Sequence, residues 1–380
     1  MSHKRYAAAA IVASLALAAC GGDDDDEPAA EPPAEEPAEE PADEPMEEPA
    51  DEPMEEPAGE DLSTLSGSIF VSGSSTVEPI SIAAGNAFAD LAPNVAVTVE
   101  GPGTGDGFAL FCAGETDVSD ASRAIKDEEM ADCEANGIEF IELKVAVDGL
   151  SPITSVENTA VECLSFVDLY ALLGPDATGR NNWSDATAQA DEIAATVTDL
   201  GAVNTPYPDA SLAVTAPGEE SGTFDFFLEE VIEGVGEALG AEDANVRPDY
   251  TASPNDNVII EGIASNPTSL GWVGFAFVEE NLDSIKPLQV DGGAGCIEPT
   301  PETIASGEFP IARPLFIYAS VPALESNAAL APFVDFYVGE ALTTLIGAEE
   351  GQVPYVPLTD EGVAATQGVW EARETGTREG

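Results

Sequence analysis

The chain has 380 residues, with 73 acidic and only 11 basic side chains, and its formal net charge is −62. So negative a chain is repelled by nucleic acid and by anionic membrane surfaces, and neither is an expected partner. The single histidine is His3, so Ser-His-Asp, Cys-His and histidine–metal sites are excluded from the rest of the chain. We therefore expect no catalytic residues, no metal site and no cofactor.

Residues 1–20 have the features of an export signal. Lys4 and Arg5 precede an apolar run that is too short to span a bilayer, and the run ends in small residues before Cys20. The pattern resembles the bacterial lipoprotein signal, in which the cysteine becomes the lipidated (palmitate-bearing) N-terminus. An ordinary secretory signal with a chance cysteine is the alternative.

Residues 21–61 form a compositionally separate segment. They contain 20 Asp or Glu, no Lys or Arg, and many prolines, and the octad at 42–49 recurs unchanged at 50–57. Such a segment cannot bury a core and repels itself, which predicts a disordered tether. A binding role for the repeat is the less favoured alternative.

From residue 62 the composition is globular, and its length favours two lobes. Taking the 20 tether acids and the two signal bases away leaves 53 acids and 9 bases, a net charge of about −44. This resembles the acidic surfaces of salt-adapted proteins. Four cysteines remain in this part, and an even number in an exported chain suggests disulfides. Proximity in the sequence favours Cys112–Cys133, which leaves Cys163–Cys296.

The hydrophobic pattern alternates between strand and helix, which predicts an α/β fold. Expected strands are 68–71, 95–100, 117–119, 139–147, 211–215 and 313–319, with an apolar run at 270–277; expected helices are 77–91, 106–113, 127–136, 166–173, 224–239, 256–265, 327–347 and 360–372.

Three turns have the same composition, and each joins a strand-like run to a helix-like one. They are Gly73-Ser74-Ser75-Thr76, Gly103-Thr104-Gly105 and Ser221-Gly222-Thr223. Glycine lets backbone N–H groups approach a ligand, hydroxyl groups add donors, and a helix N-terminus favours negative charge. Three such turns predict a site for one small oxyanion. The alternative is that all three are ordinary N-caps.

Arg123 is the candidate cation because bases are so scarce in this chain. A guanidinium can fork onto two oxygens of an anion, whereas the competing interpretation is a surface ion pair. An acid such as Asp106, Asp120 or Asp256 could accept the proton of a monohydrogen anion and so exclude sulfate.

Together these segments resemble the phosphate-binding proteins of bacterial ABC uptake systems. The resemblance extends over almost the whole globular part, and it is carried by 73–77, 103–108, 120–125, 148–149, 182–185, 221–223, 254–258, 270–274 and 313–318.

The resemblance implies a set of phosphate ligands. They are Thr76, Val77, Thr104, Ser221, Gly222 and Thr223, and we expect Ser75, Asp106, Ser122 and Arg123 to complete the site. Two positions depart from the family pattern: Pro217 stands where many members have an arginine, and Ser122 where many have an aspartate. We expect Arg123 to take the arginine's role, and the carboxylate that accepts the phosphate proton stays open.

The family also implies a two-lobed, type II periplasmic-binding-protein-like fold with two hinge crossovers. Lobe one would be 62–150 with 313–380, and lobe two 151–312. The expected function is that of a monomeric, lipid-anchored receptor on the outer face of the cell membrane, in the periplasm or at the cell surface. It would capture inorganic phosphate and deliver it to an ABC permease. The alternatives are another oxyanion such as sulfate or molybdate, an organic phosphate, or, least favoured, a phosphatase.

Overall fold

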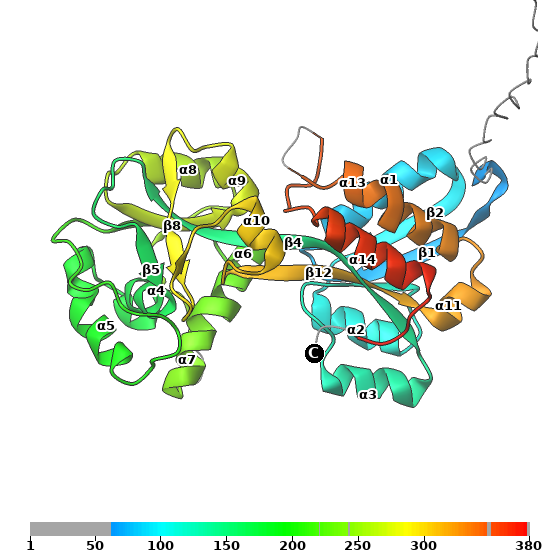
Figure 1. Ribbon diagram of the computed structural model, residues 1–380, viewed down its shortest axis with the longest axis horizontal. Helices are drawn as coiled ribbons and strands as arrows, with labels where there is room; N and C mark the ends of the chain where they lie inside the picture. Colours follow the sequence, from blue (N-terminus) through cyan, green and yellow to red (C-terminus); the bar gives the residue numbers. More distant parts are fainter. Residues whose placement is uncertain (1–61, 220, 242–243, 348–350, 378–380) are drawn as a thin grey trace, which may run out of the picture. The chain divides into compact units, whose positions relative to one another are not determined.

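The computed structural model describes residues 62–219, 221–241, 244–347 and 351–377 (Figure 1). The predicted signal peptide, Cys20 and the acidic tether lie outside the described residues. None of the helices in the described ranges has both the length and the apolar character needed to cross a membrane.

The main sheet has the strand order β2-β1-β3-β12-β4-β8-β6-β7, and β9 pairs with β4. Neighbours β2, β1 and β3 are parallel, as are β8, β6 and β7, whereas β12 and β4 run antiparallel to their neighbours. The strands are β1 (Ser66–Gly73), β2 (Asn94–Glu100), β3 (Val118–Ala121), β4 (Phe140–Ser155), β6 (Ala213–Ala216), β7 (Thr251–Ala252), β8 (Ser269–Gly274), β9 (Ile285–Pro287) and β12 (Ala312–Ser320).

A second, three-stranded sheet has the order β11-β10-β5. Its strands are β5 (Cys163–Ser165), β10 (Gln289–Asp291) and β11 (Cys296–Ile297). The disulfide Cys163–Cys296 joins its two outer strands, and Cys112–Cys133 joins two helices, so the structure has both predicted pairs.

Helices connect the strands of both sheets. They are α1 (Glu78–Leu91), α2 (Thr104–Cys112), α3 (Asp127–Asn136), α4 (Phe166–Leu173), α5 (Thr187–Ala194), α6 (Gly222–Phe227), α7 (Gly234–Leu239), α8 (Asp256–Ala264), α9 (Phe275–Glu279), α10 (Pro301–Ser306), α11 (Val321–Ser326), α12 (Leu330–Phe336), α13 (Leu342–Thr344) and α14 (Asp360–Glu371). Short 3-10 turns are η1 (Leu62–Thr64), η2 (Pro175–Ala177) and η3 (Trp183–Ala186), and π-helical turns are η4 (Leu228–Glu233) and η5 (Tyr337–Ala341).

One expected helix, 327–347, is shorter and divided. Asn327 forms a turn, in which its side-chain oxygen accepts from the Ala329 N–H at 3.2 Å, and α12 begins only at Leu330. This start places Pro332 in the first turn, where its missing N–H is tolerated. The π-helical turn η5 then interrupts the helix before α13 ends at Thr344.

Strands β4 and β12 are the long elements of the fold, and Figure 1 shows them side by side. They pair from Phe140–Ser320 to Gly149–Ala312, and β4 then continues to pair with β8 and β9. One hydrophobic core is formed by residues between 147 and 311 together with Val356 (the 147–311 core). The other buried clusters are formed by residues 69–146 and 315–370 (the outer-segment core).

Helices that alternate with the strands of a mixed sheet confirm the predicted α/β class. The lobe boundaries, 62–150 with 313–380 and 151–312, stay a prediction.

Candidate functional site

The first loop follows the C-terminal end of β1. Gly73 has φ 153°, and a Cβ there would lie 2.0 Å from the Asp120 carbonyl oxygen, so glycine is required. The Ser74 N–H donates to that same carbonyl at 2.8 Å, and the Ser74 hydroxyl accepts from the Thr76 N–H at 3.2 Å. These contacts fix the first loop on the end of β3.

The second loop is bonded to the first. The Gly103 N–H donates to the Gly73 carbonyl at 2.9 Å, and α2 then starts at Thr104. The Thr104 hydroxyl lies 3.2 Å from the Ser122 hydroxyl and accepts from the Ser122 N–H at 3.3 Å. Two predicted ligands from separate segments are therefore direct partners.

The third loop meets the first from another part of the chain. Ser221 caps α6, because its hydroxyl accepts from the Thr223 N–H at 3.2 Å. A Cβ on Gly222 would lie 3.4 Å from the Thr76 hydroxyl oxygen. The structure thus brings together the three turns that share a composition in the sequence.

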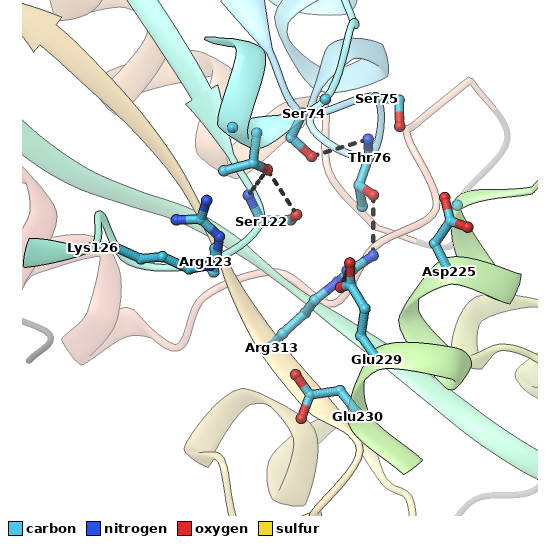
Figure 2. A pocket seen from close by; sticks show the side chains of 14 residues that line it. Ser74, Ser75, Thr76, Ser122, Arg123, Lys126, Asp225, Glu229, Glu230 and Arg313 are labelled. Atoms are coloured by element: carbon cyan, nitrogen blue, oxygen red, sulfur yellow. Dashed lines mark hydrogen bonds and ion pairs between the residues drawn. The ribbon is translucent and has the colours of Figure 1, made fainter. Parts of the chain in front are cut away.

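Two cavities, each of about 310 Å³, lie beside this meeting point, and they share Ser75, Thr76 and Gly222. Figure 2 shows the first of them. The first cavity is lined by Ser74, Ser75, Thr76, Gly103, Thr104, Gly105, Ser122, Arg123, Lys126, Gly222, Asp225, Glu229, Glu230 and Arg313. The second is lined by Ser75, Thr76, Asp148, Gly222, Thr223, Gly274, Phe277, Pro354 and Tyr355.

Most predicted ligands line these cavities, but three do not. Ser75, Thr76, Thr104, Ser122, Arg123 and Gly222 line the first, and Thr223 lines the second. Val77 is fully buried, and its N–H donates to the Ser74 carbonyl at 3.1 Å. Asp106 is exposed, and neither it nor Ser221 lines either cavity.

Arg123 lines the first cavity with its fork already occupied. Its two terminal nitrogens donate to the two Glu129 carboxylate oxygens at 2.8 and 2.7 Å, and Nη1 also donates to the Ala124 carbonyl. These Glu129 hydrogen bonds raise the pKa of Arg123 above its usual range. Arg123 therefore lines the cavity, as a ligand would, and also forms the ion pair that the alternative interpretation expected.

Arg313 is a further cation in the cavity, and from the sequence it was part of an expected strand and of a family-like segment but not a candidate ligand. It lies on β12, opposite Asp148 of β4, and donates to that carboxylate and to the Thr76 hydroxyl. The scarcity of bases that drew attention to Arg123 applies equally to Arg313, and that signal could have found it.

Carboxylates face these cations from the helix that starts at the third loop. Asp225 lies on α6, and Glu229 and Glu230 lie on η4; Figure 2 shows all three on one side of the cavity, across from Arg123 and Lys126. Burial raises the pKa of Asp225 and of Glu230, and the charge of Arg313 opposes both shifts. The site therefore combines donors, cations and proton-accepting groups.

Asp120 lies beneath the first loop without lining either cavity. It is fully buried, one carboxylate oxygen accepts from the Ser81 hydroxyl at 2.8 Å, and the other has no partner within the described residues. Burial raises its pKa to about 7. Of the other acids considered from the sequence, Asp256 also lines neither cavity.

Comparisons with known proteins agree on one family. Residues 58–341 match the model of a PBP superfamily domain. Protein SphX of Synechocystis sp. is 35% identical over 83% of this chain and 85% of its own, and the phosphate-binding protein PstS of Staphylococcus epidermidis is 33% identical over 73% and 76%. A crystal structure of a possible phosphate binding protein from Planctomyces limnophilus has a TM-score of 0.66 at 32% identity, covering 81% of this chain and 99% of that one.

These findings confirm the predicted periplasmic-binding-protein-like fold, and the homologues are solute-binding proteins rather than enzymes. The chain therefore belongs to the PBP superfamily and, within it, to the family of bacterial phosphate-binding proteins.

Proposed function

We propose that this protein captures inorganic phosphate where the two cavities meet and delivers it to the permease of an ABC transporter. The observation that carries the proposal is that Ser75, Thr76 and Gly222 line both cavities. The second loop lines the first cavity, so an ion bound there would have residues of all three loops around it. The proposed ligands are those expected from the sequence, with the lobes 62–150 plus 313–380 and 151–312 closing around them.

Selection of phosphate over sulfate would come from the carboxylates beside the site. A carboxylate accepts a hydrogen bond from a protonated phosphate, whereas sulfate at neutral pH has no proton and leaves the carboxylate unpaired. Asp225, Glu229 and Glu230 are the acids that line the first cavity, and we assign the acceptor to this group. Asp106 and Asp120 line neither cavity and are weaker candidates.

We also propose that the protein acts as a monomer anchored through lipidated Cys20 on the outer face of the cell membrane. The support is the lipoprotein-like sequence that ends at this cysteine and the acidic tether that follows. Replacing Cys20 by Ser should move the protein from the membrane fraction to the soluble fraction. Continued membrane association of that variant would contradict the anchor.

Isothermal titration of the exported chain with phosphate, sulfate and molybdate tests the ligand. We expect phosphate to bind at least about 100-fold more tightly than the other two, since unpaired buried polar groups penalise the wrong ion. Equal affinity for sulfate would reassign the ligand class. No heat with any of the three anions would remove the oxyanion function.

A further inference from the structure

Arg313 has a position that no other cation in the described cavity lining has. It lies on β12 directly opposite Asp148 of β4, and only 9% of its side chain is exposed. Its guanidinium also lies 3.9 Å from the centre of the Phe226 ring on α6. Three separate segments therefore hold one charged group at the wall of the cavity.

The donors of Arg313 are used unequally. Nε and Nη2 donate to one oxygen of Asp148 at 3.2 and 3.0 Å, and Nη2 also donates to the Thr76 hydroxyl at 3.0 Å. Nη1 has no acceptor within hydrogen-bond distance among the described residues. The nearest carboxylate oxygen, on Glu229, is 4.0 Å away, and that side chain is 63% exposed.

Although the Arg313 side chain as a whole is nearly buried, Nη1 is open to the cavity, where an anion oxygen can accept its hydrogen bond in place of water. The rest of the guanidinium is fixed by Asp148, Thr76 and Phe226, so Nη1 is pre-organised and loses little freedom on binding. A planar guanidinium also matches the oxygens of a tetrahedral oxyanion better than a lysine does.

Arg123 offers a contrast within the same cavity. Both of its terminal nitrogens are bonded to Glu129, so it would have to share or break that pair before it could bind an anion through them. Lys126 also lines the cavity, but it is exposed, and a flexible ammonium gives less geometric selection.

We propose that Arg313 binds the oxyanion directly through Nη1, with Asp148, Thr76 and Phe226 holding its guanidinium in place. This inference rests on the proposed function, and it adds a binding residue that the family resemblance did not supply. Because Arg313 lies on β12 and its partner on β4, the anion would contact the long strand pair itself. Thr76 would then be both a ligand and a support for the arginine.

Titration calorimetry with inorganic phosphate tests this on the exported chain. We expect Arg313→Met to weaken binding by about 100-fold or more, and Arg313→Lys to recover about tenfold of that loss. The matched control is Arg247→Met. Arg247 is only 2% exposed and pairs with Asp249 at 2.7 Å, but it lines neither cavity. It should lose stability and keep phosphate affinity within about threefold.

A crystal structure of the unmodified protein with phosphate keeps the test independent of variant folding. We expect a phosphate oxygen within about 3.2 Å of Nη1. If wild-type protein binds phosphate but the ion lies beyond hydrogen-bond reach of every Arg313 nitrogen, or if Arg313→Met binds it normally, the inference is wrong and the proposed function stands. If wild-type protein binds no phosphate, the proposed function fails first.

Discussion

Arg123 and Arg313 line the same cavity, but they are held in opposite ways. Arg123 is paired with a carboxylate six residues further along the chain, and 34% of its side chain is exposed. Arg313 is 9% exposed, and its hydrogen-bonding partners are 165 and 237 residues away in the sequence. Both terminal nitrogens of Arg123 are bonded to a carboxylate nearby in the sequence. Arg313 is held by residues far away in the sequence, and its Nη1 has no acceptor among the described residues.

The two ion pairs should therefore differ in energy. The Arg123–Glu129 pair, with 34% and 15% of its side chains exposed, should gain less, because solvent reaches the arginine and screens the charges. A buried pair is costly to break, because the remaining charge has lost its water. Burial raises the pKa of Asp148 even though the charge of Arg313 opposes the shift.

The largest expected effect comes from breaking the buried pair. Asp148→Ala leaves the Arg313 charge without its carboxylate and should lower the free energy of unfolding by about 3 kcal/mol. Glu129→Ala breaks the half-buried pair with Arg123 and also removes the acceptor of the Lys126 N–H at the start of α3, so it should cost less, about 1.5 kcal/mol. Urea denaturation of both variants measures the difference. Equal losses would mean that the two pairs are equivalent and would undo the comparison.

A smaller effect is expected from Asp120, which supports the loop side of the cavity. Its pKa is about 7 in the folded protein and near 3.8 when unfolded, so the unfolded chain binds fewer protons between these values. Its contribution to stability is therefore lost as the pH rises from about 4 to above 7. At about 1.4 kcal/mol per pKa unit the full difference would correspond to about 4 kcal/mol. Local rearrangement offsets part of it, so we expect Asp120→Asn to remove a decline of about 2 kcal/mol.

Thermal unfolding of wild type and Asp120→Asn at several pH values measures that slope. The Asn variant should gain on wild type as the pH rises, and the difference should be smallest near pH 4. Parallel pH profiles would show that this carboxyl titrates at an ordinary pKa.

The smallest effect is expected for Arg123 in phosphate binding. Arg123→Ala should weaken binding by about 1 kcal/mol, because its fork is shared with Glu129 and solvent screens its charge. Calorimetry beside the Arg313 variants ranks the two residues. A loss as large as that of Arg313→Met would indicate that Arg123 leaves Glu129 and becomes a principal ligand.

Much of the fold followed from local pattern. The helix at 127–136 has the expected bounds. The strand–glycine–helix turns were recognisable because a glycine marks each of them, and Gly73 and Gly103 do adopt positive φ in the structure. The expected strand 139–147 continues to Ser155 as β4, because its second half pairs with β8 and β9 far along the chain. A local hydrophobic pattern cannot predict pairing between strands that are so far apart in the sequence.

The site was predictable to the same limit. At the helix starts, glycine and hydroxyl residues are neighbours in the sequence and together form a binding loop. Thr76, Thr104 and Gly222 could therefore be proposed from the sequence. The scarcity of bases could have drawn attention to Arg313, but its contacts with Asp148, Thr76 and Phe226 join segments that are far apart in the sequence, and a local pattern does not predict them. The carboxylates of η4 were hidden for another reason: in so acidic a chain, no single Glu is conspicuous.

The two disulfides have a mechanical consequence. Cys112–Cys133 ties α2 to α3, and Cys163–Cys296 ties β5 to β11, so each reinforces one region and neither fastens the 147–311 core to the outer-segment core. Strands β4 and β12, which contribute to both cores, are not cross-linked by either disulfide. Neither of these two disulfides therefore restrains a movement of one core relative to the other. A fluorescent reporter attached to each core would measure whether the distance between them changes when phosphate is added.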